Sequence, residues 1–313
     1  MADNRDWPDI PYAPWAETCE ALHLYAQMVG KYRLARTPWV NHSWHATLYV
    51  GATGLTTGVV PDAGIDIELE LNLVDHRLVG TNSRGERVDF ALEAGTVAGF
   101  CRHLKQTIGQ LGGTPAFHGK PNEREEAIPF AQDDRARPYD RDAVARFHRA
   151  LVSVDAVFKT FRTGFLGKVS PVHLFWGSFD LAVTRFSGRE APPHPGGIPN
   201  LPDAVTREAY SHEVSSAGFW PGGGGIDEPA FYSYAYPAPP GFSDAPVEPE
   251  EASFDRRLGE FVLPYAAVRQ ADDPQATLLR FLQSTYDAAA TMGGWDRDGL
   301  ECDYGVPGRP RAV

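Results

Sequence analysis

The stretch that decides the fold is IDIELELNL, residues 65–73. Its apolar residues, Ile65, Ile67, Leu69, Leu71 and Leu73, alternate with Asp66, Glu68, Glu70 and Asn72. A period of two predicts a strand with one buried and one wet face, and therefore an antiparallel sheet with an exposed side. We interpret the three carboxylates as a solvated face rather than a cation site, because nothing nearby in the sequence supplies further ligands.

The segments around this strand complete a first group of elements. Residues 44–50 and 55–60 predict a hairpin, and turn-like residues flank further strands near 78–82 and 87–92. Apolar residues at steps of three and four predict one helix before the strands and a second helix after them. These helices span about 14–35 and 96–111, and Thr96 is the expected N-cap of the second.

The second half of the chain shows a similar order. A helix is predicted over 141–163, followed by a hairpin over 171–187 and strands near 209–217, 230–236 and 258–265. Asp273-Pro274 then opens a helix that ends near Met292. His45 and His173 occupy corresponding places after the first helix of each half. This order suggests an internal duplication with halves 1–112 and 140–294, and chance recurrence of the same order is the alternative.

These elements predict an α+β fold with largely antiparallel sheets and about four flanking helices. We expect one compact body over residues 1–313, because the alternating strands need a shared partner. Residues 113–139 have no hydrophobic period and predict a connecting segment on the surface, and residues 295–313 predict an irregular tail.

Composition excludes several classes of protein. A net charge of −12 over 313 residues, without a dense basic run, argues against nucleic acid and anionic membrane surfaces as partners. No apolar stretch is long enough to span a bilayer, and the N-terminus lacks the pattern of a secretory signal. Cys19, Cys101 and Cys302 are odd in number and widely spaced, which favours the reducing cytoplasm over a disulfide framework.

The densest mixture of aromatic and reactive side chains lies between Pro171 and Pro237. The catalytic candidates there are His173, Asp180, Arg185, His212 and Glu213. Tyr232, Tyr234 and Tyr236 form a row on one face of the predicted strand 230–236. Such a row suits the wall of a partly wet pocket, an interface or an ordinary sheet face. The candidates for substrate binding are His45, Trp176, Trp220, Tyr232, Tyr234 and Tyr236. Asp180 and Arg185 could equally form a structural ion pair.

No cofactor can be assigned from motifs. Phosphate-loop, dinucleotide-binding, zinc-protease and serine-hydrolase patterns are absent, and the glycine run at 222–225 reads as a flexible connection or hinge. His173, His212 and either Asp180 or Glu213 could form a mononuclear divalent-metal site of the two-histidine, one-carboxylate kind, although their spacing does not specify one.

The chain resembles a bacterial family of uncharacterised proteins. The resemblance rests on WPDIPYAPWAETCEALHLYAQMVGK, TPWVNHSWHATLYV, HLFWGSFDLAVTRFSGR, YSHEVSSAGFWPG and FYSYAYP, and it covers nearly the whole chain. It implies no reaction, cofactor or catalytic residue.

Two functions remain open from the sequence. The first is a small-molecule enzyme, metal-assisted or not, in which His173 and His212 meet in one cleft. The second is a protein without catalysis that binds a ligand or oligomerises, in which the histidines are structural. The sequence does not specify an oligomeric state.

Overall fold

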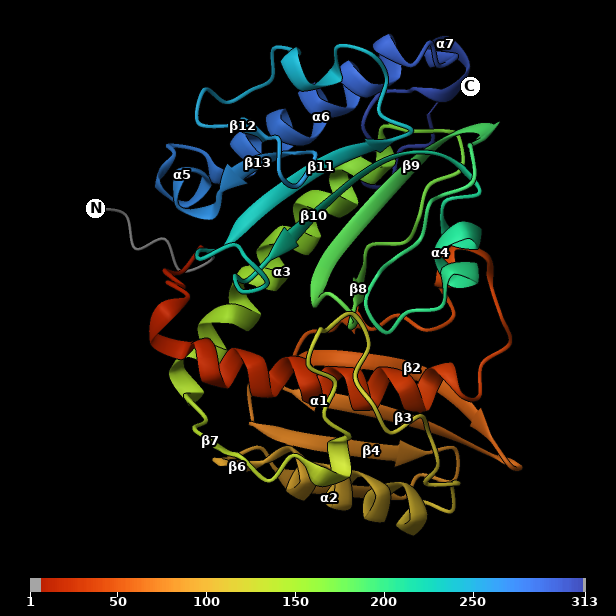
Figure 1. Ribbon diagram of the computed structural model, residues 1–313, viewed down its shortest axis with the longest axis vertical. Coiled ribbons are helices and arrows are strands. Elements are labelled where there is room, and N and C mark those ends of the chain that lie inside the picture. The colour runs from red at the N-terminus through yellow and green to blue at the C-terminus, as the bar shows by residue number, and fades with distance from the viewer. Residues whose placement is uncertain (1–6, 312–313) are drawn as a thin grey trace.

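Two antiparallel sheets organise the computed structural model, which describes residues 7–311 (Figure 1). The first sheet has the order β1 (Tyr49–Val50), β2 (Gly54–Asp62), β3 (Ile65–Asn72), β4 (Arg77–Asn82) and β5 (Arg87–Ala91). The second has the order β12 (Ser253–Asp255), β13 (Glu260–Pro264), β11 (Ala230–Tyr236), β10 (His212–Trp220), β9 (Asp180–Glu190) and β8 (His173–Phe175). A small pair joins β6 (Gly95–Thr96) to β7 (Ala136–Arg137). The predicted α+β class with largely antiparallel sheets is confirmed.

Four long helices flank the sheets, as the sequence predicted. They are α1 (Ala16–Leu34), α2 (Val97–Gln110), α3 (Arg141–Thr163) and α6 (Pro274–Met292). The helices α1 and α2 pack against the first sheet, and α3 and α6 pack against one face of the second (Figure 1). The short helices α4 (Asp203–Ala209), α5 (Tyr265–Gln270) and α7 (Arg297–Leu300) were not predicted.

The strand β3 follows the predicted alternation from Ile65 to Leu69 and departs from it at Asn72, which is buried although the wet face was expected. Ile65, Ile67 and Leu69 are buried, whereas Asp66 and Glu68 are exposed. The buried face contacts the apolar stripe of α2. The hydroxyl of Thr96 accepts a hydrogen bond from the Gly99 N–H at 2.9 Å and begins that helix at the predicted N-cap.

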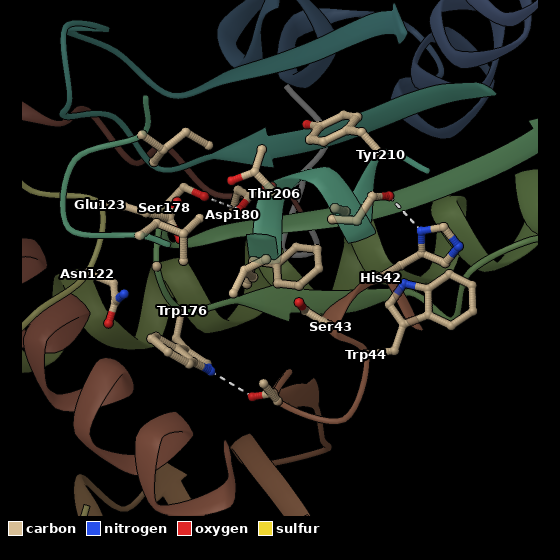
Figure 2. Close-up of a pocket in the computed structure, with 18 of the residues that line it drawn as sticks. His42, Ser43, Trp44, Asn122, Glu123, Trp176, Ser178, Asp180, Thr206 and Tyr210 are labelled. Carbon is tan, nitrogen blue, oxygen red and sulfur yellow. Dashed lines mark hydrogen bonds between the residues drawn. The ribbon is translucent and has the colours of Figure 1, made fainter. Parts of the chain in front are cut away.

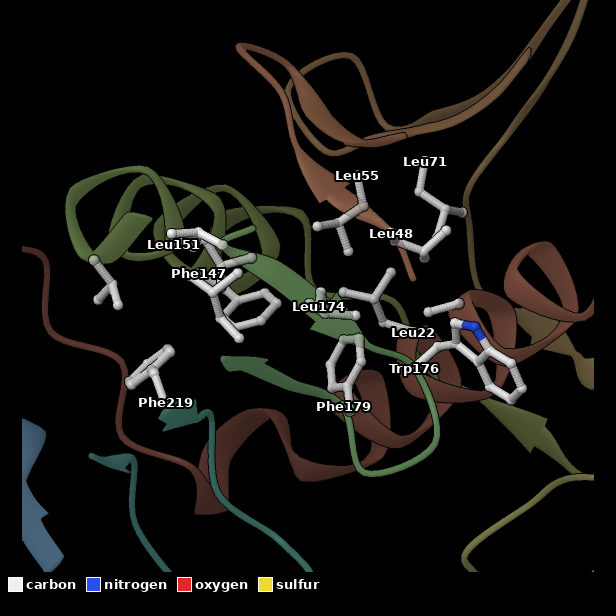
Figure 3. Packing of buried hydrophobic residues seen from close by; sticks show 14 of the residues in the cluster. Leu22, Leu48, Leu55, Leu71, Phe147, Leu151, Leu174, Trp176, Phe179 and Phe219 are labelled. Carbon is white, nitrogen blue, oxygen red and sulfur yellow. The ribbon is translucent and has the colours of Figure 1, made fainter. Parts of the chain in front are cut away.

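The two sheets meet edge to edge at one point. The backbone N–H groups of Leu48 and Leu174 each donate to the other's carbonyl oxygen, at 3.0 and 2.8 Å. Figure 3 shows that Leu48 and Leu174 lie with Leu22 of α1 and Phe179 in the same packed cluster. Buried side chains of both sheets therefore share one hydrophobic core. The order helix, sheet, helix occurs twice along the chain, and its origin by duplication stays a prediction.

The segment 113–139 is not simply a surface connection. Its Phe130 is fully buried, and Asp133 and Arg137 form a buried ion pair with nitrogen–oxygen distances of 3.1 and 2.8 Å. Polar residues can be buried here because they satisfy each other. Among the residues described, no helix combines the length and apolarity needed to cross a membrane.

Candidate functional site: an aromatic cavity with buried carboxyl groups

A cavity of about 1010 Å³ lies on the face of the second sheet that α3 and α6 leave free. Its floor is made by side chains that alternate along β9, β10 and β11, among them Ala182, Thr184 and Ser216. Residues 118–123 and 198–210, which include α4, cover it. The volume lies at the upper end of the range of small-molecule sites.

Aromatic rings form most of the wall. They are Trp39, Trp44, Phe175, Trp176, Phe186, Tyr210, Trp220, Tyr232 and Tyr234. The Trp176 indole N–H donates to the Ala46 carbonyl at 2.6 Å, which fixes the ring (Figure 2). The rings of Trp220 and Tyr232 lie 4.2 Å apart between centroids. Such a wall presents a large apolar surface with a few hydroxyl groups.

Two glycines make room for these rings. A Cβ atom on Gly30 of α1 would lie 2.1 Å from the Trp176 ring, and one on Gly218 of β10 would lie 2.3 Å from the Tyr232 ring. No side chain fits at such distances, so the cavity wall depends on glycine at both positions.

Two carboxyl groups, those of Glu123 and Asp180, lie near the Ser178 side chain in the cavity (Figure 2). The Ser178 hydroxyl donates to Asp180 Oδ1 at 3.0 Å, and it lies close enough to the Glu123 carboxyl to lower the pKa of that group. The Tyr232 hydroxyl donates to Asp180 Oδ2. The Glu123 carboxyl lies directly over Gly177, where a Cβ atom would meet its Oε1 at 1.8 Å.

Long-range backbone contacts bring Glu123 to this position. The Glu123 N–H donates to the Pro199 carbonyl at 2.9 Å, and the Asn122 N–H donates to Gln27 Oε1 at 2.8 Å. The segment before α3 is thus held between α1 and the loop that precedes α4.

Burial makes both carboxyl groups weaker acids. Burial is the main cause that raises the pKa of Glu123 to about 7, and the negative charge of Asp180 adds to it. Burial also raises the pKa of Asp180, while hydrogen bonds from Tyr232 and Ser178 oppose this shift. Glu123 therefore exchanges protons near neutral pH, as a general acid or base must.

A third carboxyl group, Glu260 of β13, also lines the cavity. Its Oε2 is buried and has no hydrogen-bond partner among the residues described. Burial, followed by the charges of Asp180 and Asp255, raises the pKa of Glu260 to about 8. Glu260 is therefore mostly protonated at neutral pH.

At the other end of the cavity, His42 and Trp44 face α4 (Figure 2). His42 Nδ1 donates to the Ala209 carbonyl at 2.6 Å, and Lys168 Nζ lies 2.7 Å from His42 Nε2. Both ring nitrogens of His42 are engaged, so this histidine positions the covering helix.

Five of the residues predicted from the sequence line the cavity. They are Asp180, Trp176, Trp220, Tyr232 and Tyr234. The structure thus brings together one predicted carboxylate and four predicted aromatic residues, whose functional roles stay predictions.

The expectation that His173 and His212 meet in one cleft is wrong. His173 lies opposite Ala182, which in turn lies opposite Gly218 of β10, and Gly218 is six residues from His212. Six residues of strand separate the two positions by about 20 Å. Neither histidine lines the cavity. His173 is buried without a partner for either ring nitrogen among the described residues, and His212 Nδ1 bonds the Ser211 hydroxyl.

Arg185 and Glu213 lie on the opposite face of the sheet from the cavity. Arg185 is five residues from Asp180 on the same strand, so the two side chains point apart and the considered ion pair does not form. The Arg185 guanidinium lies 3.6 Å from the Phe161 ring centroid and donates to the Phe161 carbonyl. Glu213 pairs with Arg189 at 2.6 Å. Both residues are structural contacts in this fold.

The remaining predicted residues lie just outside the cavity. The ring of His45 contacts the backbone of Val40 and packs against Trp39. The Tyr236 hydroxyl donates to the Pro192 carbonyl at 3.0 Å. These contacts occupy His45 Nδ1 and the Tyr236 hydroxyl, whereas His45 Nε2 is buried without a hydrogen-bond partner among the described residues.

The considered metal site is not supported by this geometry. His173, His212 and Glu213 lie apart or on different faces from Asp180, as described above. Over residues 7–311 no three histidine, cysteine, aspartate or glutamate side chains come together as metal ligands.

Among the residues that line the cavity, Glu123, Glu260 and Lys31 were not predicted from the sequence. Glu123 lies in a segment without periodicity, so nothing local indicated its position. Lys31 carried a weak signal, since the apolar residues Met28, Val29 and Tyr32 lie close to it in the helix.

The fold and this site define an α+β protein with a large aromatic cavity that contains buried carboxyl groups. Residues 7–302 match the model of DUF5996, a family of unknown function, and the chain belongs to that family. Neither the curated proteins nor the solved structures contain a match to this chain.

Proposed function

We propose that this protein is an enzyme that acts on a small organic molecule held in the cavity, with Glu123 and Asp180 exchanging protons with it. One observation carries the proposal. Two carboxyl groups lie beside the Ser178 hydroxyl inside an aromatic cavity, and burial keeps the pKa of Glu123 near neutrality. Two acids with different environments are a common arrangement for paired acid and base catalysis.

The alternative is a protein that binds a ligand in the cavity without changing it. The aromatic wall suits either function. The carboxyl groups favour the enzyme, because burying two of them beside each other destabilises the fold and gives no advantage in holding an apolar molecule. The proposal retains the predictions of a cytoplasmic location and of a small molecule, rather than nucleic acid or membrane, as partner.

Incubation with a small-molecule extract of bacterial cells, followed by mass spectrometry, tests the proposal. We expect the wild-type protein to deplete some compounds and produce others. Glu123→Gln should lose this conversion by at least 100-fold, in the range expected when a general acid or base is removed. Glu125→Gln changes an exposed glutamate two residues away and is the matched control.

The result also separates the two functions. Conversion at equal rates by the wild type and by Glu123→Gln would refute the role given to Glu123. Compounds that are retained by the protein but recovered unchanged, with the same affinity for both variants, would establish the binding protein instead.

A further inference from the structure

Lys31 is a buried amine on the wall of the cavity. Its side chain is 2% exposed, although lysine is among the residues least often buried. The other lysines of the chain are exposed or partly exposed; they are Lys105, Lys120, Lys159 and Lys168. The position of Lys31 in α1 therefore needs a specific explanation.

The contacts of Lys31 leave its charge without a close counter-ion. The ammonium group donates to Asn122 Oδ1 and lies 5.1 Å from the centroid of the Trp176 ring. Among residues 7–311 it forms no ion pair with a carboxylate. Glu123 follows Asn122 directly, and its charge still acts on Lys31 through space. Figure 2 shows Asn122, Trp176 and Glu123 at the same end of the cavity.

We propose that Lys31 is a nucleophile that captures the carbonyl carbon of a neutral aldehyde or ketone as an imine, with Glu123 as the acid. This inference rests on the proposed function, because it assigns the substrate class of the same cavity.

The reaction balances without an oxidant or reductant. The lone pair of Lys31 Nζ forms a bond to the carbonyl carbon, and a proton moves from nitrogen to oxygen to give a carbinolamine. The protonated carboxyl group of Glu123 then donates a proton to the hydroxyl group, which leaves as water while the C=N bond forms. The nitrogen keeps its second proton, so the product is a protonated imine beside the Glu123 carboxylate. One C=O bond is replaced by one C=N bond, and one water molecule is released.

The acidities of the two groups suit these steps. Burial is the main cause that lowers the pKa of Lys31 to about 8, and the Glu123 charge opposes it. About a tenth of the Lys31 side chains are therefore neutral at pH 7, compared with well under a thousandth for a lysine in water. With a pKa of about 7, Glu123 is protonated about half of the time and can supply the proton.

The cavity also selects the kind of carbonyl compound. Its walls are aromatic, and Asp180 and Glu123 contribute negative charge near the reacting position. A carboxylate on the substrate would be repelled there. We therefore expect an aldehyde or ketone with an uncharged aromatic or apolar body to react in preference to a 2-oxo acid.

Reductive trapping of the wild-type protein tests this inference without knowledge of the natural substrate. Benzaldehyde and sodium cyanoborohydride are added at pH 7, and labelled lysines are identified by peptide mass spectrometry. We expect Lys31 to be labelled at least ten times as fast as the exposed Lys159, with half of the maximal rate near pH 8. Labelling of Lys31 no faster than Lys159 would overturn the inference.

Two further arms test the acid and the substrate class. Glu123→Gln should slow the trapping at Lys31 at least tenfold, and Glu125→Gln should leave it unchanged. Equal rates of trapping at Lys31 in the wild type and in Glu123→Gln would show that Glu123 is not the acid in this step. Pyruvate should label Lys31 more slowly than benzaldehyde, and equal rates would refute the preference for neutral compounds.

The inference and the proposed function can fail separately. If Lys31 is not labelled while compounds of the extract are still converted in a manner that depends on Glu123, the imine is refuted and the enzyme stands. If Lys31 is labelled but no compound is converted, the enzyme is refuted and the reactive lysine stands.

Discussion

Replacing Glu123 by glutamine should stabilise the protein at alkaline pH. In the folded protein the pKa of Glu123 is raised to about 7 from an ordinary value of 4.5. Each tenfold difference in proton affinity between the folded and unfolded states is worth about 1.4 kcal/mol, so the full difference is about 3 kcal/mol. Glu123 is partly exposed, so solvent screening reduces this to about 2 to 3 kcal/mol.

The sign follows from which state binds the proton. Below pH 4.5 both states are protonated, and Glu123 contributes nothing to the pH dependence. Between pH 4.5 and 7 only the folded state retains the proton, so the free energy of unfolding falls as the pH rises. Above pH 7 the carboxylate is ionised in both states and the full destabilisation remains. Glutamine does not ionise and avoids this loss.

The assay is thermal or urea unfolding of the wild type and Glu123→Gln between pH 5 and 8. With an unfolding entropy of about 2.1 cal/mol/K per residue, 2 to 3 kcal/mol corresponds to about 3 to 5 °C in Tm. The variant should gain this amount over the wild type between pH 5 and pH 8, and Glu125→Gln should follow the wild type. Parallel curves for Glu123→Gln and wild type over this range would refute the reasoning.

Three other substitutions test the fold and its pH dependence. Asp133→Asn removes the buried carboxylate that pairs with Arg137 and leaves Glu20, 3.8 Å from Arg137 Nε, as its acidic contact. It should lower the free energy of unfolding in urea by about 3 kcal/mol; a loss below 1 kcal/mol would contradict the buried pair. Gly30→Ala should displace the Trp176 ring, change the tryptophan fluorescence spectrum and cost about 1 to 3 kcal/mol; an unchanged spectrum would mean that the ring has room to stay. Burial lowers the pKa of His173 to about 4, so the unfolded state alone binds this proton between pH 6.5 and 4 and stability is lost as the pH falls through that window. His173→Phe should reduce the loss of unfolding free energy between pH 6.5 and 4 by about 3 kcal/mol, measured as Tm against pH. The same fall in Tm in this pH range for variant and wild type would show that His173 does not titrate there.

The regular elements were predictable because local sequence determines them. Three elements have the predicted bounds: the helices over 141–163 and 274–292 and the strand over 230–236. Their apolar periods, and the Asp273-Pro274 start of the last helix, can be recognised from the sequence. The same periodicity correctly places Tyr232 and Tyr234 on one face of their strand.

The site was predicted less well because it depends on contacts between distant residues. A register shift between His212 and Val214 breaks the alternation on which the placement of His212 was based. Glu123 is positioned by the Pro199 carbonyl, which no local pattern could reveal. Residues that lie on a continuous strand could be assigned to a face, whereas residues in irregular segments could not.

The reactive groups of the cavity come from three distant parts of the chain. Lys31 belongs to the first helix, Glu123 to the segment between the two sheets, and Asp180 to the second sheet. A gene divided near residue 135 would therefore encode two fragments, neither of which has a complete set of chemical groups. Lys31 and Glu123 both lie in the first fragment, whereas Trp176 and Asp180 of the cavity wall lie in the second. Imine trapping at Lys31 that requires the second fragment would therefore report reassembly of the cavity, which makes this chain a candidate for a split reporter.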